Sequence, residues 1–164
     1  MRLLRRSSAL PIDTQTFWVD ETTPLRNLNF NTLMVGQSVA QRYRFTDEAM
    51  RHFADIANDR APLHLELDTA RNIGFDARIV QGLAVASRFS RLIGMYLPGA
   101  SAVLQSSNFK FLRLTFVGQE IECIATITKV AKVLRCVKMR LLVQSGDGFH
   151  VDGWCQCMVR PNHQ

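Results

Sequence analysis

An aspartate and a histidine stand five residues apart at the point where a helical pattern stops. The stretch FADIANDRAPLHLE, residues 53–66, begins with helical spacing and ends in a turn that carries Asp59 and His64. Imidazole titrates near neutral pH, and a nearby carboxylate fixes its tautomer and basicity, so the pair can take a proton from water and return it. The spacing alone fits more simply a solvated turn in which the Asp59 side chain bonds its own backbone.

Two more residues that could take part lie on the next helical segment. Gly82 opens that helix within the sequence VQG, and free N–H groups at a helix N-terminus, aided by the dipole, can stabilise an oxyanion. A glycine there can also simply allow a tight entry into the helix. Ser90 lies eight residues further along, off the apolar stripe that begins at Leu83, where a serine is commonly solvated or bonded to the preceding turn. Neither residue identifies a site when it is taken singly.

The elements that must position these residues are two helices and a set of strands. Alternation over 35–46 predicts a strand, Thr46 is a good N-cap, and residues 47–57 have the spacing of an amphipathic helix. The apolar segment 79–99 predicts a long helix that is buried on most sides. The chain after Ser101 predicts strands that are joined mostly by short turns.

This order of elements predicts an α+β fold. A strongly twisted antiparallel sheet of about five strands can wrap around one long helix and bury it. Such a sheet has open edges, and pairing two sheets edge to edge removes one from each, so we expect a homodimer. Residues 1–30, which lack a steady period and contain Pro11 and Pro24, are predicted to form an irregular arm before the single domain 31–164.

The composition agrees with one globular domain. The chain has 164 residues, of which 47% are hydrophobic, enough to bury a core and to exclude wholesale disorder. Its 20 basic and 14 acidic residues leave a formal charge of +6, which suits an anionic partner. The basic residues are scattered without interleaved aromatics, so nucleic acid is not expected. No apolar run approaches the roughly 20 residues that a membrane span needs.

The cysteines are predicted to be core residues. All of them lie on strand patterns in the last third of the chain: Cys123, Cys136, Cys155 and Cys157. Zinc sites usually place paired ligands on turns, so this spacing favours small apolar residues on strands. We therefore expect no metal, and the sequence gives no reason to expect a cofactor.

The sequence predicts a cytoplasmic protein with reduced thiols, because no secretory signal is visible. The first ten residues, MRLLRRSSAL, are rich in arginine and serine, and no acid precedes Asp13. An organellar transit peptide and a frayed basic terminus both fit that composition. Of the two interpretations we favour the frayed terminus.

Taken together, three segments resemble the MaoC-like family of (R)-specific enoyl-CoA hydratases and 3-hydroxyacyl-thioester dehydratases. Residues 53–66 are similar to the motif Phe-Ala-x-Leu-Ser-Gly-Asp-x-Asn-Pro-Leu-His-x-Asp/Glu, with Asp59 and His64 in place. Residues 79–99 resemble Ile-Val-His-Gly-Met-Leu followed by a leucine-rich stretch and Leu-Pro-Gly. Residues 108–121 resemble Phe-x-Phe-x-x-Pro-Val-x-x-Gly-Asp-x-Ile. The three matches occur in order.

The resemblance implies a hotdog fold, in which a curled antiparallel sheet surrounds the helix 82–97. It implies reversible hydration of trans-2-enoyl thioesters to (R)-3-hydroxyacyl thioesters, carried on CoA or acyl carrier protein. Asp59 and His64 match the pair that activates water and protonates the alpha carbon. The Gly82 amide matches the oxyanion donor to the thioester carbonyl, and Ser90 matches a serine that supports the active-site hydrogen bonds.

The chain departs from the family motifs at several positions around this site. Asn58 replaces a glycine, Ala61 replaces an asparagine, and Gln81 replaces a histidine. In the third segment Leu114 and Gln119 replace a proline and an aspartate. None of these changes removes the acid–base pair. They leave two alternatives open, a hotdog thioesterase and a non-catalytic subunit that binds acyl thioesters.

An anionic substrate would also need cations around the site. Arg78, Lys110 and Arg113 could meet the phosphates of CoA or the acidic face of a carrier protein, although each is explained equally by an ordinary solvated charge.

Overall fold

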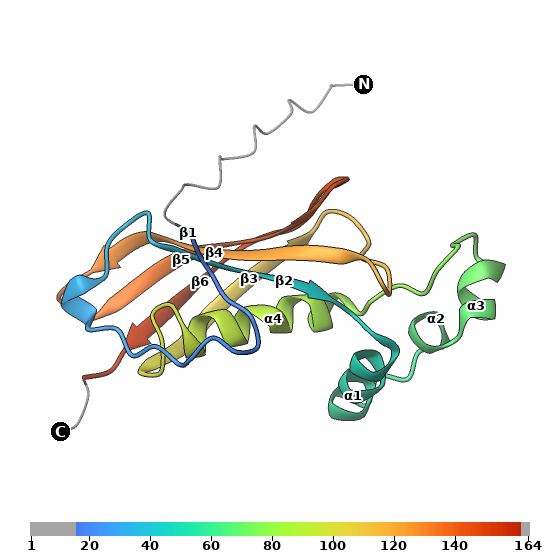
Figure 1. Cartoon of the computed structure of the whole chain (residues 1–164), viewed down its shortest axis with the longest axis horizontal. Helices are drawn as coiled ribbons and strands as arrows, with labels where there is room; N and C mark the ends of the chain where they lie inside the picture. The colour runs from blue at the N-terminus through green and yellow to red at the C-terminus, as the bar shows by residue number, and fades with distance from the viewer. Residues whose placement is uncertain (1–15, 162–164) are drawn as a thin grey trace.

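A curved sheet with one long helix lying along its face forms the body of the protein (Figure 1). The computed structural model describes residues 16–161. Along the chain the elements are β1 (Thr16–Trp18), the 3-10 helix η1 (Phe30–Thr32), β2 (Ser38–Arg44), α1 (Asp47–Ala57), α2 (Pro62–Leu65), α3 (Leu67–Asn72), α4 (Gly82–Met95), β3 (Ala102–Phe111), β4 (Glu120–Ala131), β5 (Cys136–Ser145) and β6 (Gly148–Val159). The helices α1, α2 and α3 extend beyond one end of the sheet, and α4 lies along it (Figure 1).

The sheet is mixed and open. Residues 16–161 form six strands in the order β1-β2-β4-β5-β6-β3. β1 runs parallel to β2, whereas the other neighbouring pairs are antiparallel. The predicted antiparallel sheet of about five strands corresponds to β2, β4, β5, β6 and β3, and the structure adds a parallel strand, β1, at one edge.

That extra strand belongs to the N-terminal arm. Residues 1–30 are predicted to be irregular, but Thr16–Trp18 form β1 and Asn27 bridges to Gly99. Pairing satisfies backbone groups that would otherwise be open along the outer edge of β2. A strand of three residues is too short for its alternation to be recognised in a sequence. Residues 1–15 lie outside the described residues, and so does the prediction for the basic start of the chain.

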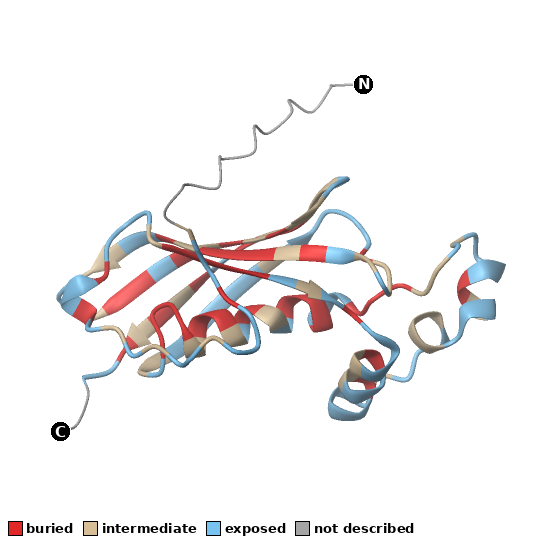
Figure 2. Cartoon of the chain, in the orientation of Figure 1, coloured by how far each residue is buried: buried red, intermediate tan, exposed pale blue. Residues whose placement is uncertain are grey.

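Helix α4 buries most of its length against the sheet (Figure 2). Phe89 and Leu92 are 2% and 0% exposed, and they share one core cluster with Met139 of β5. Leu83, in the first turn, is instead 68% exposed, so the apolar stripe is not covered along its whole length. No helix among residues 16–161 is long and apolar enough to cross a membrane.

The cysteines line the core, as the sequence predicts. All four are buried and free, and the sulfur atoms of Cys155 and Cys157 lie 4.0 Å apart. Burial raises the pKa of the Cys123 thiol to about 12, so this thiol stays protonated. Within residues 16–161, no three side chains of His, Cys, Asp or Glu are grouped so that they could hold a metal ion.

Helix α1 has the bounds that its sequence predicts. The Thr46 hydroxyl caps it by accepting the Ala49 N–H at 3.2 Å. Asn58 ends it in the left-handed region, with φ of 51°. Asparagine tolerates this conformation better than most residues that carry a side chain, so Asn58 can stand where the family motif has glycine.

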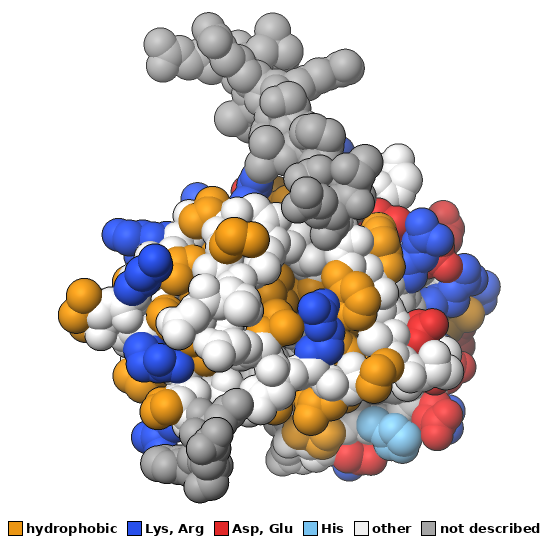
Figure 3. All heavy atoms as spheres, turned by 60° about the vertical axis from the view of Figure 1, so that its left-hand side comes forward, with side chains coloured by type: hydrophobic (Ala, Val, Ile, Leu, Met, Phe, Trp, Pro, Cys, Tyr) orange, Lys and Arg blue, Asp and Glu red, His pale blue; other side chains and the backbone are white. Residues whose placement is uncertain are grey.

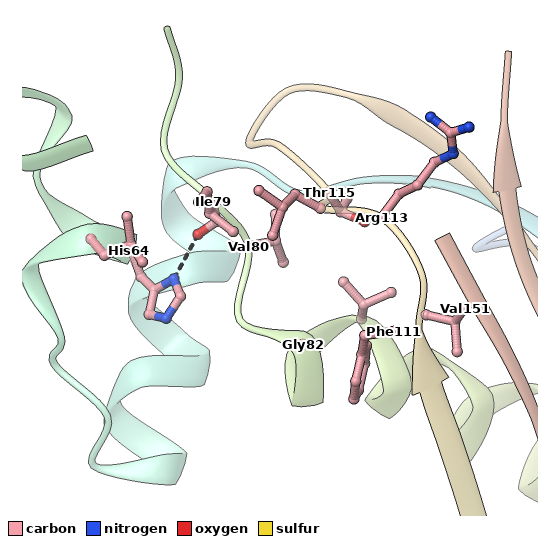
Figure 4. Close-up of a pocket in the computed structure, with 11 residues that line it drawn as sticks. His64, Ile79, Val80, Gly82, Phe111, Arg113, Thr115 and Val151 are labelled. Atoms are coloured by element: carbon pink, nitrogen blue, oxygen red, sulfur yellow. Dashed lines mark hydrogen bonds between the residues drawn. The ribbon is translucent and has the colours of Figure 1, made fainter. Parts of the chain in front are cut away.

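The segment that follows α1 is more ordered than the predicted turn. Pro62 opens the short helix α2, where its fixed φ and missing N–H are tolerated. A second short helix, α3, follows directly. His64 lies on α2, next to the segment that leads into α4 (Figure 4).

Candidate active site

A pocket of about 220 Å³ lies where the start of α4 meets α2 and the end of β3 (Figure 4). Its lining includes His64, Ile79, Gly82, Phe111, Thr115 and Val151. Mostly apolar walls around a few polar groups are the usual form of a site for a small molecule.

His64 is held in one orientation by a backbone carbonyl. The ring Nδ1 lies 2.8 Å from the Ile79 carbonyl oxygen, across the gap between α2 and the segment before α4 (Figure 4). Because a carbonyl only accepts, Nδ1 carries the proton and donates, and the neutral ring keeps Nε2 as its acceptor. No side chain or backbone group of the described residues bonds Nε2. The half-buried imidazole is therefore arranged to accept a proton from a molecule in the pocket.

Gly82 supplies the helix terminus on the other side of the pocket. It is the first residue of α4, and within residues 16–161 no side chain caps this helix. A Cβ at position 82 would lie 3.1 Å from the Phe111 ring, so the glycine lets that aromatic ring pack against the helix start. Exposed N–H groups and the helix dipole favour an anionic oxygen at this point.

Asp59 is placed differently from the sequence-based expectation. Its Oδ1 accepts the Ala61 N–H at 3.2 Å, which is the local turn contact that the simpler interpretation gives. His64 and Gly82 line the pocket, and Asp59 is not among the described residues that line it. The structure thus brings the imidazole and the helix terminus together and leaves the carboxylate on the adjoining turn.

Ser90 lines a second cavity beside α4. This cavity, of about 230 Å³, lies between α4 and β3 and is lined by Leu83, Ile93, Leu104, Phe109 and Ser90 itself. The Phe109 and Phe111 ring centroids are 6.5 Å apart, one ring at each cavity. Two neighbouring cavities therefore flank the first turns of α4.

The three basic residues considered for an anionic substrate have different surroundings. Arg78 forms an ion pair with Asp47 and donates to the Leu65 carbonyl at 3.3 Å, so it ties the short helices together. Arg113 lines the pocket, with its guanidinium directed away from His64 (Figure 4). Lys110 is exposed on β3. On the face drawn in Figure 3, Lys and Arg side chains are spread over the surface, and those at the right lie beside Asp and Glu side chains.

Two parts of the site carry no signal in the sequence. The Ile79 carbonyl orients His64, but a backbone carbonyl is common to every residue type. Thr115 and Val151 come from a loop and from β6, far along the chain, and reach the pocket only through the sheet. Phe111 does have a signal, since it is the second aromatic residue of the Phe-x-Phe pattern.

Residues 30–147 match the MaoC like domain. The chain belongs to the MaoC-like family. It is 31% identical over 121 residues to an (R)-specific enoyl-CoA hydratase of Aeromonas caviae, a match that covers 73% of this chain and 90% of the relative. The solved structure of an (R)-hydratase from A. caviae superposes with a TM-score of 0.76, at 28% identity, over 79% of this chain and 98% of that one. The MaoC-like domain described here therefore has the hotdog fold.

A second relative matches a shorter stretch. A mitochondrial 3-hydroxyacyl-[acyl-carrier-protein] dehydratase of Arabidopsis thaliana is 36% identical over 89 residues. That match covers 54% of this MaoC-like chain and 52% of the relative, so the chain spans about half the length of this relative.

Proposed function

We propose that the chain catalyses the reversible hydration of trans-2-enoyl thioesters to (R)-3-hydroxyacyl thioesters on CoA or acyl carrier protein. One observation carries the proposal: an imidazole whose Nδ1 is fixed by the Ile79 carbonyl and the open terminus of α4 line the same pocket. The hydratase and dehydratase names of the relatives agree with it.

In the proposed reaction, water adds its oxygen to the beta carbon and a proton is delivered to the alpha carbon. His64 takes the proton of the attacking water at Nε2, a role that typically contributes about 10²- to 10⁴-fold in rate. The resemblance to the family motif, and not the pocket lining, assigns Asp59 a share in the proton transfers, through the carboxylate oxygen that does not accept the Ala61 N–H. The same groups serve dehydration in the reverse direction.

Charge gathers on the thioester oxygen between the two steps. The Gly82 N–H, with the α4 dipole behind it, stabilises that enolate, and one such donor is typically worth about 3 kcal/mol. We assign the acyl chain to the neighbouring apolar cavity between α4 and β3, which Ser90 lines. The resemblance to the family motif gives Ser90 its role of supporting the hydrogen bonds of the active site.

We propose a homodimer that forms across β3. Among the described strands, β3 pairs with β6 along one side and lies at the edge of the sheet. Val103, Leu104 and Phe111 on this strand are 48%, 51% and 50% exposed, and Leu83 of α4 is exposed nearby. Light scattering after size exclusion should give twice the mass of one chain, and a monomer at micromolar concentration contradicts this proposal.

We propose a cytoplasmic location, where reduced thiols such as the buried free cysteines persist. The name of the Arabidopsis relative says mitochondrial, so the mitochondrion is the alternative. A C-terminal fluorescent fusion, expressed with and without residues 1–15, separates the two. Mitochondrial signal that depends on those residues contradicts the cytoplasmic proposal.

A single assay with crotonyl-CoA tests the function. Its enoyl absorbance falls on hydration, whereas hydrolysis releases a free thiol. The proposal expects loss of absorbance without thiol release. Thiol release indicates the thioesterase alternative, and no change in either signal indicates a subunit that only binds acyl thioesters.

A further inference from the structure

A second histidine, outside the pocket, is fully buried and surrounded by polar partners. His150 on β6 is 0% exposed. Its Nδ1 lies 3.1 Å from the Thr115 hydroxyl, and its Nε2 lies 2.9 Å from the Ser145 hydroxyl and 3.1 Å from Asp147 Oδ1. The proposed reaction gives this group no direct part.

The partners fix how the His150 ring is protonated. The hydrogen bonds from Ser145 and from the ring hold the pKa of Asp147 below its usual value, so this residue is a carboxylate and only accepts. Nε2 therefore carries the proton, and in the neutral ring Nδ1 accepts from the Thr115 hydroxyl. The Thr115 hydroxyl and the Asp147 carboxylate lie on opposite ring nitrogens, which is the order of a nucleophilic relay, but the ring is 0% exposed and Thr115 is 4% exposed. The cluster therefore has a structural role and does not act as a nucleophile.

What His150 holds is the loop that follows β3. Its backbone carbonyl accepts the Leu112 N–H at 2.8 Å, and its ring binds the side chain of Thr115. Thr115 is 4% exposed, so water does not compete for this bond. Residues 112–115 are thus fixed to β6 at both ends of the stretch.

The same loop holds the segment that leads into α4. The Thr115 carbonyl accepts the Val80 N–H at 2.8 Å, and Ile79 and Phe116 form an isolated antiparallel bridge. The segment with Ile79 and Val80 is therefore joined to the loop at Thr115 (Figure 4). The loop in turn is joined to His150.

Both proposed catalytic groups depend on that segment. The Ile79 carbonyl orients His64, and Gly82 begins the helix whose terminus meets the thioester oxygen. We propose that His150, acting through the Thr115 hydroxyl, is a positioning residue that sets the imidazole and the oxyanion donor in their relative places. This inference rests on the hydratase function proposed above.

Two positions at which the chain departs from the quoted motif supply polar side chains to this cluster. Thr115 and Gln119 stand where the quoted motif has valine and aspartate. Thr115 binds the His150 ring, and the Gln119 amide donates to Ser145 at 3.3 Å and to Asp147 at 3.4 Å. An aspartate at position 119 would face the Asp147 carboxylate and be repelled by it. Thr115, Gln119 and His150 are therefore joined in one hydrogen-bond network.

Steady-state kinetics with crotonyl-CoA test the positioning role. Thr115→Val keeps the shape of the side chain and removes the hydroxyl. A misplaced catalytic group lowers the rate of the chemical step more than it weakens binding, so kcat should fall about 10-fold with KM within about twofold of the wild type. Thr115→Ser restores the hydroxyl and should recover kcat to within about threefold. Wild-type kcat in Thr115→Val overturns the proposal.

Nuclear magnetic resonance gives a readout that does not need turnover. With ¹⁵N-labelled glycine and histidine, Thr115→Val should shift the Gly82 amide and His64 Nδ1 resonances, and Thr115→Ser should leave them in place. Thr126→Val is the matched control, because it also removes a threonine hydroxyl bonded at 2.8 Å, here to Ser38 Oγ, on strands away from the pocket. It should move neither resonance.

The two arms separate the possible failures. If the wild type does not hydrate crotonyl-CoA but both resonances move in Thr115→Val, the proposed function fails and the positioning role stands. Unmoved resonances in Thr115→Val overturn the positioning role whatever the activity. Should that variant not fold, His150→Gln replaces it with the same expected shifts, and unshifted resonances there have the same meaning.

Discussion

His64 and His150 are both histidines near one pocket, but the protein surrounds them in opposite ways. His64 is half-buried and commits one ring nitrogen, to a backbone carbonyl at 2.8 Å. His150 is fully buried, and both of its ring nitrogens are bonded to side chains. A histidine with one nitrogen left uncommitted can exchange a proton with a ligand, whereas one with both nitrogens satisfied is a structural link. The hydrogen-bond partners, more than the residue type, decide the role.

Removing the imidazole of His64 tests this contrast most strongly. His64→Ala should lower kcat for crotonyl-CoA hydration by about 10²- to 10⁴-fold, because the water loses its general base. The melting temperature should stay close to that of the wild type, since a single bond of a half-buried ring is lost. His52→Ala, on the exposed side of α1, is the matched control with unchanged activity. Full activity of His64→Ala would falsify the catalytic assignment.

Asp59→Asn asks whether the carboxylate on the adjoining turn belongs with His64. The amide oxygen can still accept the Ala61 N–H, so the turn should persist while the charge is lost. We expect hydration to fall by about 10²-fold or more, since the amide cannot share proton transfers. Asp68→Asn, at a side chain that is 94% exposed, is the control. Equal hydration rates for Asp59→Asn and the wild type would leave Asp59 with its structural contact in the turn and no catalytic role.

His150→Ala should lower the free energy of unfolding more, and the rate of hydration less, than His64→Ala does. It leaves a cavity and strips partners from the Thr115 and Ser145 hydroxyls, so the free energy of unfolding should drop by about 2–4 kcal/mol. Urea denaturation monitored by fluorescence measures this change. A loss below 1 kcal/mol contradicts the structural link.

Two glycines of α4 give the smallest expected effects and a matched pair. Gly82→Ala places a Cβ 3.1 Å from the Phe111 ring, which must shift by a few tenths of an ångström, so hydration should fall several-fold. Gly94→Ala meets no described atom within 4 Å and should stabilise the helix by about 0.4–1 kcal/mol with activity unchanged. Thermal melts and crotonyl-CoA rates on both variants check the pair. Equal activity of the two variants shows that the helix terminus tolerates the added methyl group.

Local sequence patterns predicted the helices and strands whose signal repeats along the chain. The cap at Thr46 and helical spacing predicted α1 with its observed bounds, and apolar periodicity predicted α4 and the later strands. The three motif segments predicted that His64 and Gly82 would meet, and they line one pocket. These features follow from residue type and spacing, which a sequence records directly.

The features that were missed depend on geometry between distant residues. β1 is three residues long, and its pairing satisfies the edge of β2, which its own residues do not reveal. The bond between Thr115 and His150 spans 35 positions, and the Ile79 carbonyl is a backbone group. Asp59 matches the motif yet lies outside the pocket lining, since a motif fixes order along the chain and not side-chain direction.

The short strand β1 limits how copies of this chain could associate. It occupies the outer side of β2 over three residues, which is too brief a ladder to recruit another strand firmly. The ten-residue strand β3 at the far side offers the longer template. Because the two edges of the sheet differ, two copies that pair through β3 about a twofold axis form a closed dimer. Neither copy then has a second edge of the same kind through which a fibre could grow.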